Sequence, residues 1–184
     1  MYMSMNKTNS LFKTQKENKP KIETLIPEWL DGDMKMNALE FTAWLRANKM
    51  SPTWASANSW KASYKGKRIC YVKLLYIDRE GDKNKKYSWV ISVYYTNRDK
   101  YDEAVKNEGL QSHIRDNPWH CNCTIGGLPQ NCGSRMDVTI LGTEIKGVCG
   151  GYYHMYFCDP DAKAIDGIKK LIEFEQNDRK NLIF

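Results

Sequence analysis

The chain has 184 residues, a formal net charge of +6 and a hydrophobic fraction of 41%. This length accommodates one domain with a tail, and the aromatic fraction of 12% supplies a core that a disordered chain would lack. No apolar run approaches the roughly 18 residues of a membrane span and the N-terminus has no apolar secretory segment, so we expect a cytoplasmic protein that does not contact a membrane.

The N-terminal segment, residues 1–21, differs in composition from the rest of the chain. It holds mostly Lys, Asn, Ser and Thr, and its apolar residues follow no period. This composition predicts a disordered basic tail. We place a single α+β domain over residues 22–184. Its first stretch, residues 22–30, is apolar enough to dock on the domain, although Pro27 argues against a continuous helix there.

The first half of the domain has the pattern of one helix followed by three strands. Leu39, Ala43 and Ala47 recur at intervals of four residues, which predicts a helix with Asn37 as its N-cap. Three antiparallel strands follow, because apolar residues alternate there or run continuously. They cover residues 60–65, 68–77 and 87–95. The very polar segment between the last two predicts an exposed hairpin loop.

The second half begins with a predicted helix over residues 97–114. A turn-rich segment, residues 119–134, is longer than an ordinary connection and has no period. Strands are predicted over residues 138–141 and 152–158, before a last helix with Asp159 as N-cap and Pro160 at its first position. The order is α-β-β-β-α-loop-β-β-α. It predicts an α+β fold in which helices pack on one face of a mainly antiparallel sheet.

Four of the six cysteines and all three histidines lie between residues 113 and 154. Thiolate and imidazole suit zinc, and a bound metal orders a loop that has few apolar residues to bury. We therefore predict a structural, tetrahedral zinc site. Its candidate ligands are Cys121, Cys123, Cys132 and Cys149, with His120 or His154 as possible substitutes. The loop offers no acidic residue to assist a metal-bound water, which argues against a catalytic zinc.

Other uses of these thiols stay open. They could be unligated core or loop residues, or they could form disulfides in an oxidising compartment. Cys70, inside a predicted strand, is expected in the core, and Cys158, at a strand end, is expected to be structural. A cysteine-dependent enzyme is a further alternative, because Cys149 lies among glycines that predict a flexible turn. No local motif supports that alternative.

Residues 61–100 hold eleven Lys and Arg residues against four Asp and Glu residues, interleaved with Trp and Tyr. Aromatic and cationic side chains on a sheet could stack bases and neutralise phosphates, so nucleic-acid binding is one hypothesis. A solvated loop is the simpler interpretation of the same charges. The candidate residues for nucleic acid are Lys65, Lys67, Arg68, Lys83, Lys85 and Lys86.

A small-molecule pocket is the hypothesis that we place first. A curved antiparallel sheet under helices often encloses a cavity, and Trp side chains in it would favour a small aromatic or cationic ligand. The candidates are Trp54, Trp60 and Trp89, and an ordinary aromatic core is the alternative. Together with the predicted zinc site, this interpretation describes a non-enzymatic binding or sensing module.

The sequence also carries one resemblance, which implies a layout and no activity. The run MNALEFTAWLRANKMSPTWASANSWKASYKGKRICYVKL, the cysteine-rich loop, VTILGTEIKGVC and a C-terminal helix resemble a family of small uncharacterised bacterial, clostridial-type, cysteine-containing proteins. The likeness covers residues 36–175. It implies a layout similar to the ligand-binding domains of some transcription regulators, by analogy only. That family has closer cysteine pairs than Cys121 and Cys123, so the resemblance implies no ligand set.

Overall fold

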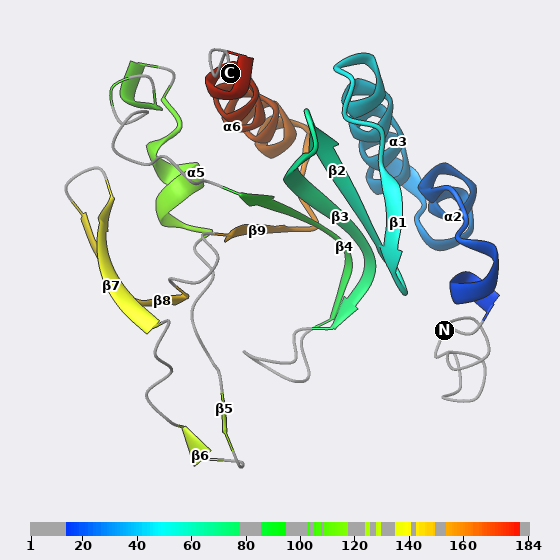
Figure 1. Ribbon diagram of the computed structural model, residues 1–184, viewed down its shortest axis with the longest axis horizontal. Helices are drawn as coiled ribbons and strands as arrows, with labels where there is room; N and C mark the ends of the chain where they lie inside the picture. Colours follow the sequence, from blue (N-terminus) through cyan, green and yellow to red (C-terminus); the bar gives the residue numbers. More distant parts are fainter. Residues whose placement is uncertain are drawn as a thin grey trace.

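The main sheet has five antiparallel strands in the order β1-β2-β3-β4-β9 (Figure 1). Its strands are β1 (Thr53–Ser56), β2 (Ser59–Tyr64), β3 (Lys67–Ile77), β4 (Lys86–Tyr94) and β9 (His154–Cys158). The computed structural model of the chain describes residues 14–77, 86–94, 103, 105–107, 109–117, 124–125, 128–129, 135–140, 143–149 and 154–180.

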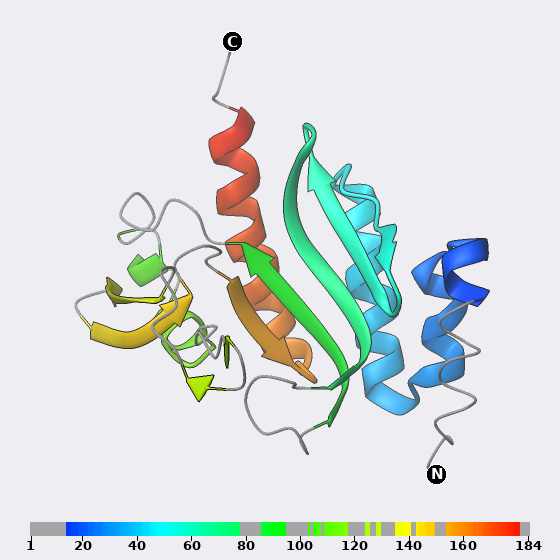
Figure 2. The same cartoon turned by 60° about the horizontal axis from the view of Figure 1, so that its bottom comes forward.

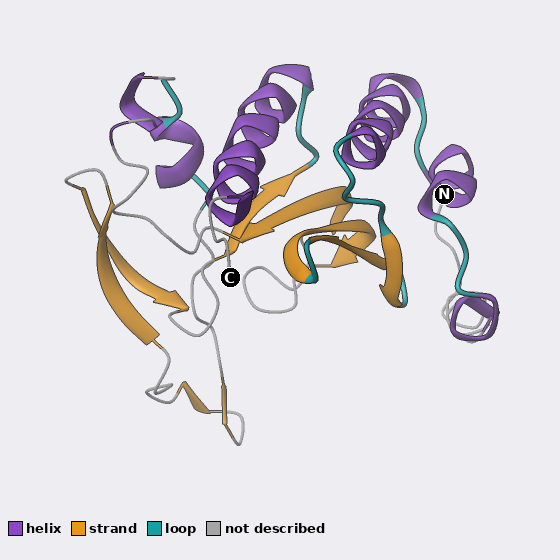
Figure 3. Cartoon of the chain, turned by 45° about the horizontal axis from the view of Figure 1, so that its top comes forward, coloured by secondary structure: helices purple, strands orange, loops and turns teal. Residues whose placement is uncertain are grey.

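Helices cover one face of this sheet (Figure 3). The long helices α3 (Gly32–Ala47) and α6 (Ala162–Lys180) lie on that face, α2 (Ile22–Trp29) packs beside α3, and α6 lies behind β4 and β9 in Figure 2. The predicted α+β fold with a mainly antiparallel sheet is confirmed. No helix in the described part of the chain is long and apolar enough to cross a bilayer.

The remaining elements lie beyond β9. They are α5 (Gln111–Arg115), the short pair β5 (Thr124–Ile125) and β6 (Leu128–Pro129), and the hairpin of β7 (Arg135–Ile140) and β8 (Thr143–Cys149). Asn117, just after α5, contacts β9, where the Tyr156 N–H donates to the Asn117 carbonyl at 2.9 Å.

The core lies between the sheet and the helices. Val72, Ile91 and Phe157 are paired in register across β3, β4 and β9, and all three are buried in one apolar cluster with residues of α3 and α6. Because strand residues alternate between faces, their neighbours Tyr71, Ser92 and Tyr156 point to the opposite face. The sheet therefore has an apolar side under the helices and a second side of different composition.

The N-terminal segment packs on the sheet from residue 14 onward. Residues 14–18 are helical, and Gln15 is 4% exposed. Its side chain bonds twice to Asn58, donating to Oδ1 at 2.7 Å and accepting from the backbone N–H at 2.8 Å. Trp60 Nε1 also donates to the Pro20 carbonyl at 2.8 Å. The prediction of a disordered tail over residues 1–21 is therefore wrong for residues 14–21, and residues 1–13 lie outside the described residues.

Two helices begin at residues other than the predicted ones. The predicted caps were Asn37 and Asp159, but α3 begins at Gly32. Before α6, the Asp161 carboxylate accepts from the Ala164 N–H at 2.7 Å and is the N-cap. Asp159 instead accepts from the Trp89 N–H at 2.9 Å and so connects the start of α6 to β4.

Two predicted interruptions are absent from the described elements. Pro27 lies inside α2, which is tolerated because the helix ends two residues later and Pro27 removes only one backbone N–H. Gly147, Val148 and Cys149 of the predicted glycine turn are part of β8, and Gly150 and Gly151 lie outside the described residues. Gly147 adopts φ +70° and its N–H donates to Asp137 Oδ1 at 2.8 Å. Its pairing with β7 shifts at this point, which is typical of a β-bulge.

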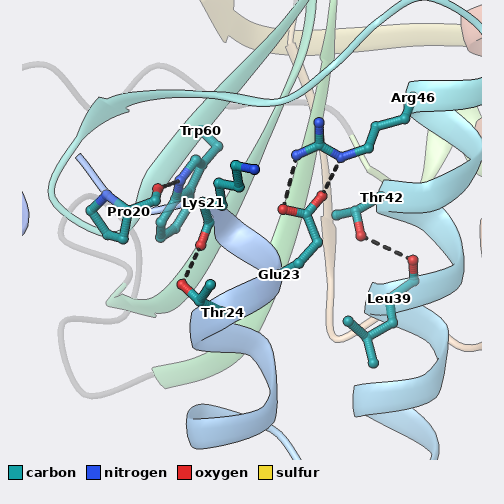
Figure 4. A network of polar contacts seen from close by, with 8 residues as sticks. All are labelled: Pro20, Lys21, Glu23, Thr24, Leu39, Thr42, Arg46 and Trp60. Atoms are coloured by element: carbon teal, nitrogen blue, oxygen red, sulfur yellow. Dashed lines mark hydrogen bonds and ion pairs between the residues drawn. The ribbon is translucent and has the colours of Figure 1, made fainter. Parts of the chain in front are cut away.

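Helices α2 and α3 are joined by a bidentate ion pair (Figure 4). Arg46 donates to the two carboxylate oxygens of Glu23 at 2.6 and 2.9 Å. Burial raises the pKa of Glu23. The hydrogen bonds from Arg46 and from the backbone, together with the charge of Arg46, outweigh this effect, so the pKa of Glu23 lies below the ordinary value of 4.5. The pair thus connects α2 to α3 at the surface.

Candidate ligand-binding face

The side of the sheet opposite the helices carries tyrosines and cations. We call it the tyrosine-cation face and define it by Arg68, Tyr71, Lys73, Tyr94 and Tyr156. Tyr71 and Lys73 are two residues apart on β3, so they share a side of the strand. Tyr71 and Tyr156 both pair with Ser92 of β4, which places them on either side of it.

Arg68 reaches this face because of a β-bulge. The pairing of β2 with β3 passes from Ala62 opposite Cys70 to Ser63 opposite Arg68, so Ile69 is the extra residue. Ile69 and Cys70 are both fully buried in the core. In a regular strand Arg68 would share the core side with Cys70. The bulge therefore turns Arg68 to the side of Tyr71.

The Arg68 guanidinium contacts two tyrosine rings. Its Cζ atom lies 4.8 Å from the ring centroid of Tyr94 and 5.3 Å from that of Tyr71. The two ring centroids are 6.3 Å apart, and Nη1 of Arg68 donates to the Tyr71 hydroxyl at 2.5 Å. These distances are within the range of cation-π attraction. Arg68 itself is exposed, so solvent reaches this end of the face.

Lys73 repeats the arrangement with Tyr156. Its Nζ atom lies 4.7 Å from the ring centroid of Tyr156 and donates to the hydroxyl at 3.1 Å. Both residues are half-buried. Because β4 lies between β3 and β9, this contact spans the strand that contains Ser92. Three strands thus contribute to one array of rings and cations.

Tyr94 forms the base of the array. It is 8% exposed, and burial raises the pKa of its phenol well above the ordinary value. The charge of Arg68 opposes this effect, while Tyr71 and Tyr156 reinforce it. The Tyr94 phenol therefore stays protonated at neutral pH and presents a neutral ring to Arg68.

The sheet carries an uneven charge. Its five strands contain five Lys and Arg residues and no Asp or Glu residue. They are Lys61, Lys67, Arg68, Lys73 and Lys86.

A small open pocket lies between α5, β9 and α6. Its volume is about 210 Å³, below the roughly 300 Å³ at which organic ligand sites begin. His113 and Cys158 line it, and Nδ1 of His113 is buried with no hydrogen-bond partner among the described residues. The other edge of the His113 ring lies against Gly167 of α6. This pocket fits a small group and offers no stacking surface for an organic ring beyond Phe157 and Pro160.

The predicted pocket tryptophans lie mainly in the core. Trp60 and Trp89 are fully buried in the cluster under the helices, and Trp54 is half-buried against it. Nε1 of Trp54 and of Trp89 is buried without a hydrogen-bond partner among the described residues. The three tryptophans are on the helix side of the sheet and do not contribute to the tyrosine-cation face, so their ligand role remains a prediction.

Most of the predicted zinc ligands lie outside the described residues, namely His120, Cys121, Cys123 and Cys132. Of Cys149 only the backbone is described, at the end of β8. Where the chain is described, no three His, Cys, Asp or Glu side chains are grouped to hold a metal. Cys70 is a core residue as expected, and burial raises its pKa to about 12.

The nucleic-acid candidates divide between two ends of the sheet. Lys65, Lys67 and Arg68 are exposed at the turn between β2 and β3. Lys86 begins β4, whereas Lys83 and Lys85 lie outside the described residues.

The sequence analysis did not identify Lys73 and Tyr156 as site residues. Alternation along β3 could have paired Lys73 with Tyr71, but the position of Tyr156 depends on the distant pairing of β9 with β4.

Comparison of the chain with protein-family models, with curated proteins and with solved structures finds no match. The geometry of the sheet and the chemistry of its residues therefore carry the functional argument.

Proposed function

We propose that this protein is a non-enzymatic small-molecule binding or sensing module whose ligand lies across the tyrosine-cation face. The observation that carries the proposal is the array in which Arg68 and Lys73 contact three tyrosine rings from three strands. Rings on rigid strands are good binding surfaces, because they lose little conformational entropy when a ligand binds.

Thermal unfolding of the full chain with a panel of aromatic acids, amines and amides tests the proposal. A ligand that binds the folded state raises the melting temperature by mass action. We expect at least one class to raise it in the wild type and to lose this effect in Tyr71→Ala. Tyr64→Ala is the matched control, because Tyr64 is a half-buried tyrosine that packs on the core side. Equal effects in both variants, or none in the wild type, would refute the proposal.

Nucleic-acid binding is the second candidate. The observation in its favour is that Lys65, Lys67 and Arg68 are exposed at the turn between β2 and β3, and that Arg68 contacts the Tyr71 ring. A strand of bases and phosphates would need cations and rings in such proximity. Binding of a single-stranded oligonucleotide must then weaken steeply with salt. A flat salt response, or no binding at low salt, would dismiss this partner.

A structural zinc ion in the cysteine-rich segment is part of the same proposal. Its support is the grouping of Cys121, Cys123, Cys132 and Cys149 with His120 in a segment poor in apolar residues. Cytoplasmic, reduced protein purified without added zinc should contain about one equivalent. Metal-free protein in which all the thiols can be titrated would refute the zinc site. The proposal for the tyrosine-cation face would not be affected by that result.

A further inference from the structure

We infer that residues 14–21 form a strap that opens as one unit while the rest of the fold stays closed. Its opening and closing control access to the turn at Asn58 and to the indole edge of Trp60. Trp60 belongs to the core cluster on the helix side of the sheet, so this conformational device is separate from the tyrosine-cation face.

The strap reaches the sheet at two anchor residues, Gln15 and Pro20. Gln15 is 4% exposed, and its side chain donates to Asn58 Oδ1 at 2.7 Å and accepts from the Asn58 N–H at 2.8 Å. Pro20 is half-buried, and its carbonyl accepts from Nε1 of Trp60 at 2.8 Å (Figure 4). The other residues of the strap are exposed. Both anchors thus bind through polar atoms.

The strap has little apolar surface to bury. Its sequence, TQKENKPK, contains no aliphatic or aromatic side chain apart from the ring of Pro20. Hydrophobic burial is the main favourable term in folding, whereas hydrogen bonds within the protein replace bonds to water and stabilise it only modestly. Lys19 also adopts φ +43°, a left-handed conformation that lysine disfavours. Docking of the strap is therefore weakly favoured compared with packing of the core.

The buried part of the chain begins directly after the strap. Ile22 and Ile26 of α2 are fully buried in the core cluster, and Glu23 of the same helix is bonded to Arg46 of α3. Lys21 is extended and exposed. When the strap leaves the sheet, α2 therefore keeps its own contacts, and the chain can turn at Lys21. Local openings of this kind lie at the low-stability end of the native state.

Native-state hydrogen exchange of the full chain, followed by NMR at several low urea concentrations, tests this device. The probes are the Lys19 N–H, which donates to the Gln15 carbonyl, the Asn58 N–H and the indole N–H of Trp60. We expect these three to share one protection factor, at least about tenfold below that of the amides of β3 and β4. It should hardly change with urea, because a local opening exposes little surface.

Gln15→Ala tests whether the two anchors act as one unit. This change leaves the bond between Trp60 and Pro20 in place, but it should speed exchange of the Trp60 indole N–H by about tenfold, because the other anchor is lost. Lys16→Ala, at an exposed neighbour, is the matched control and should not alter the exchange of any of the three probes.

Two results would overturn the inference. Strap probes as protected as β3 and β4, with the same dependence on urea, would show that the strap leaves only when the whole chain unfolds. An unchanged Trp60 indole rate in Gln15→Ala would show that the anchors are independent. The urea series on the wild-type chain tests the strap without any variant.

Discussion

Glu23 and Arg46 show how one ion pair can make the contact between two helices depend on pH. Their side chains are 28% and 38% exposed, so solvent screens the pair and its contribution is about 0.5 kcal/mol. The pKa of Glu23 is lower in the folded state, so this contribution is full above pH 4.5 and is lost as the pH falls through the lowered value.

Glu23→Gln should therefore reduce the free energy of unfolding by about 0.5 kcal/mol at pH 7 and by progressively less as the pH falls below 4.5. Urea unfolding at several pH values measures this difference. Glu28→Gln, an exposed change on the same helix, is the control and should have little effect at any pH. A difference that does not change with pH would contradict the assignment.

Gly167 is the residue that lets α6 approach α5. A Cβ atom at this position would lie 2.5 Å from Nε2 of His113. Gly167→Ala should therefore lower the free energy of unfolding by roughly 1–3 kcal/mol, as overpacking does. In a His113→Ala background the same change should raise it by about 0.5–1 kcal/mol, because alanine favours a helix interior. Thermal or urea unfolding of the four proteins checks this reversal of sign, and destabilisation in both backgrounds would contradict it.

At the scale of elements, Lys65 in the turn between β2 and β3 adopts a left-handed backbone conformation that lysine disfavours. Lys65 and Gly66 have φ angles of +47° and +76°, the geometry of a type I′ hairpin turn that favours Asn-Gly. Lys65→Asn should therefore raise the free energy of unfolding by about 0.5–1 kcal/mol. Lys67→Asn, one residue into the strand, is the control and should not raise it. A higher melting temperature in the control alone would refute the turn assignment.

Residues 14–21, before α2, pack on the sheet although their polar composition predicts disorder. Gln15→Ala would leave the Asn58 N–H and Oδ1 without their bonds in a buried site, which costs about 1–3 kcal/mol. Lys16→Ala, at an exposed neighbour, should cost little. Chemical unfolding of the two variants compares them directly, and equal stability would show that the segment does not hold the sheet.

The sequence predicts the elements with strong periods and misses those that depend on distant partners. The strands around Val72 and Ile91 and the apolar stripe of α6 follow from alternation and helical spacing. The docking of Gln15 on Asn58 does not, because a polar side chain 43 residues away supplies the bonds. The bulge at Ile69, which turns Arg68 to the tyrosine-cation face, also has no local sequence signal.

At the scale of the whole molecule, the two sides of the sheet differ in their side chains. Its helix side buries Trp60 and Trp89, which were predicted to bind a ligand, and its other side gathers tyrosines and cations from β3, β4 and β9. Aromatic composition alone cannot tell these sides apart. The alternation of side chains along each strand does tell them apart, once the register of β9 against β4 is known.

The central claim is that a ligand binds across the tyrosine-cation face. Its most direct test is titration of isotope-labelled full-length protein with the aromatic acid, amine or amide that raises its melting temperature most, with amide chemical shifts followed residue by residue. We predict the largest shifts at Arg68, Tyr71, Lys73, Tyr94 and Tyr156, with a common saturation curve. Shifts confined to the helix side around Trp60 and Trp89, or to the pocket at His113, would contradict the claim.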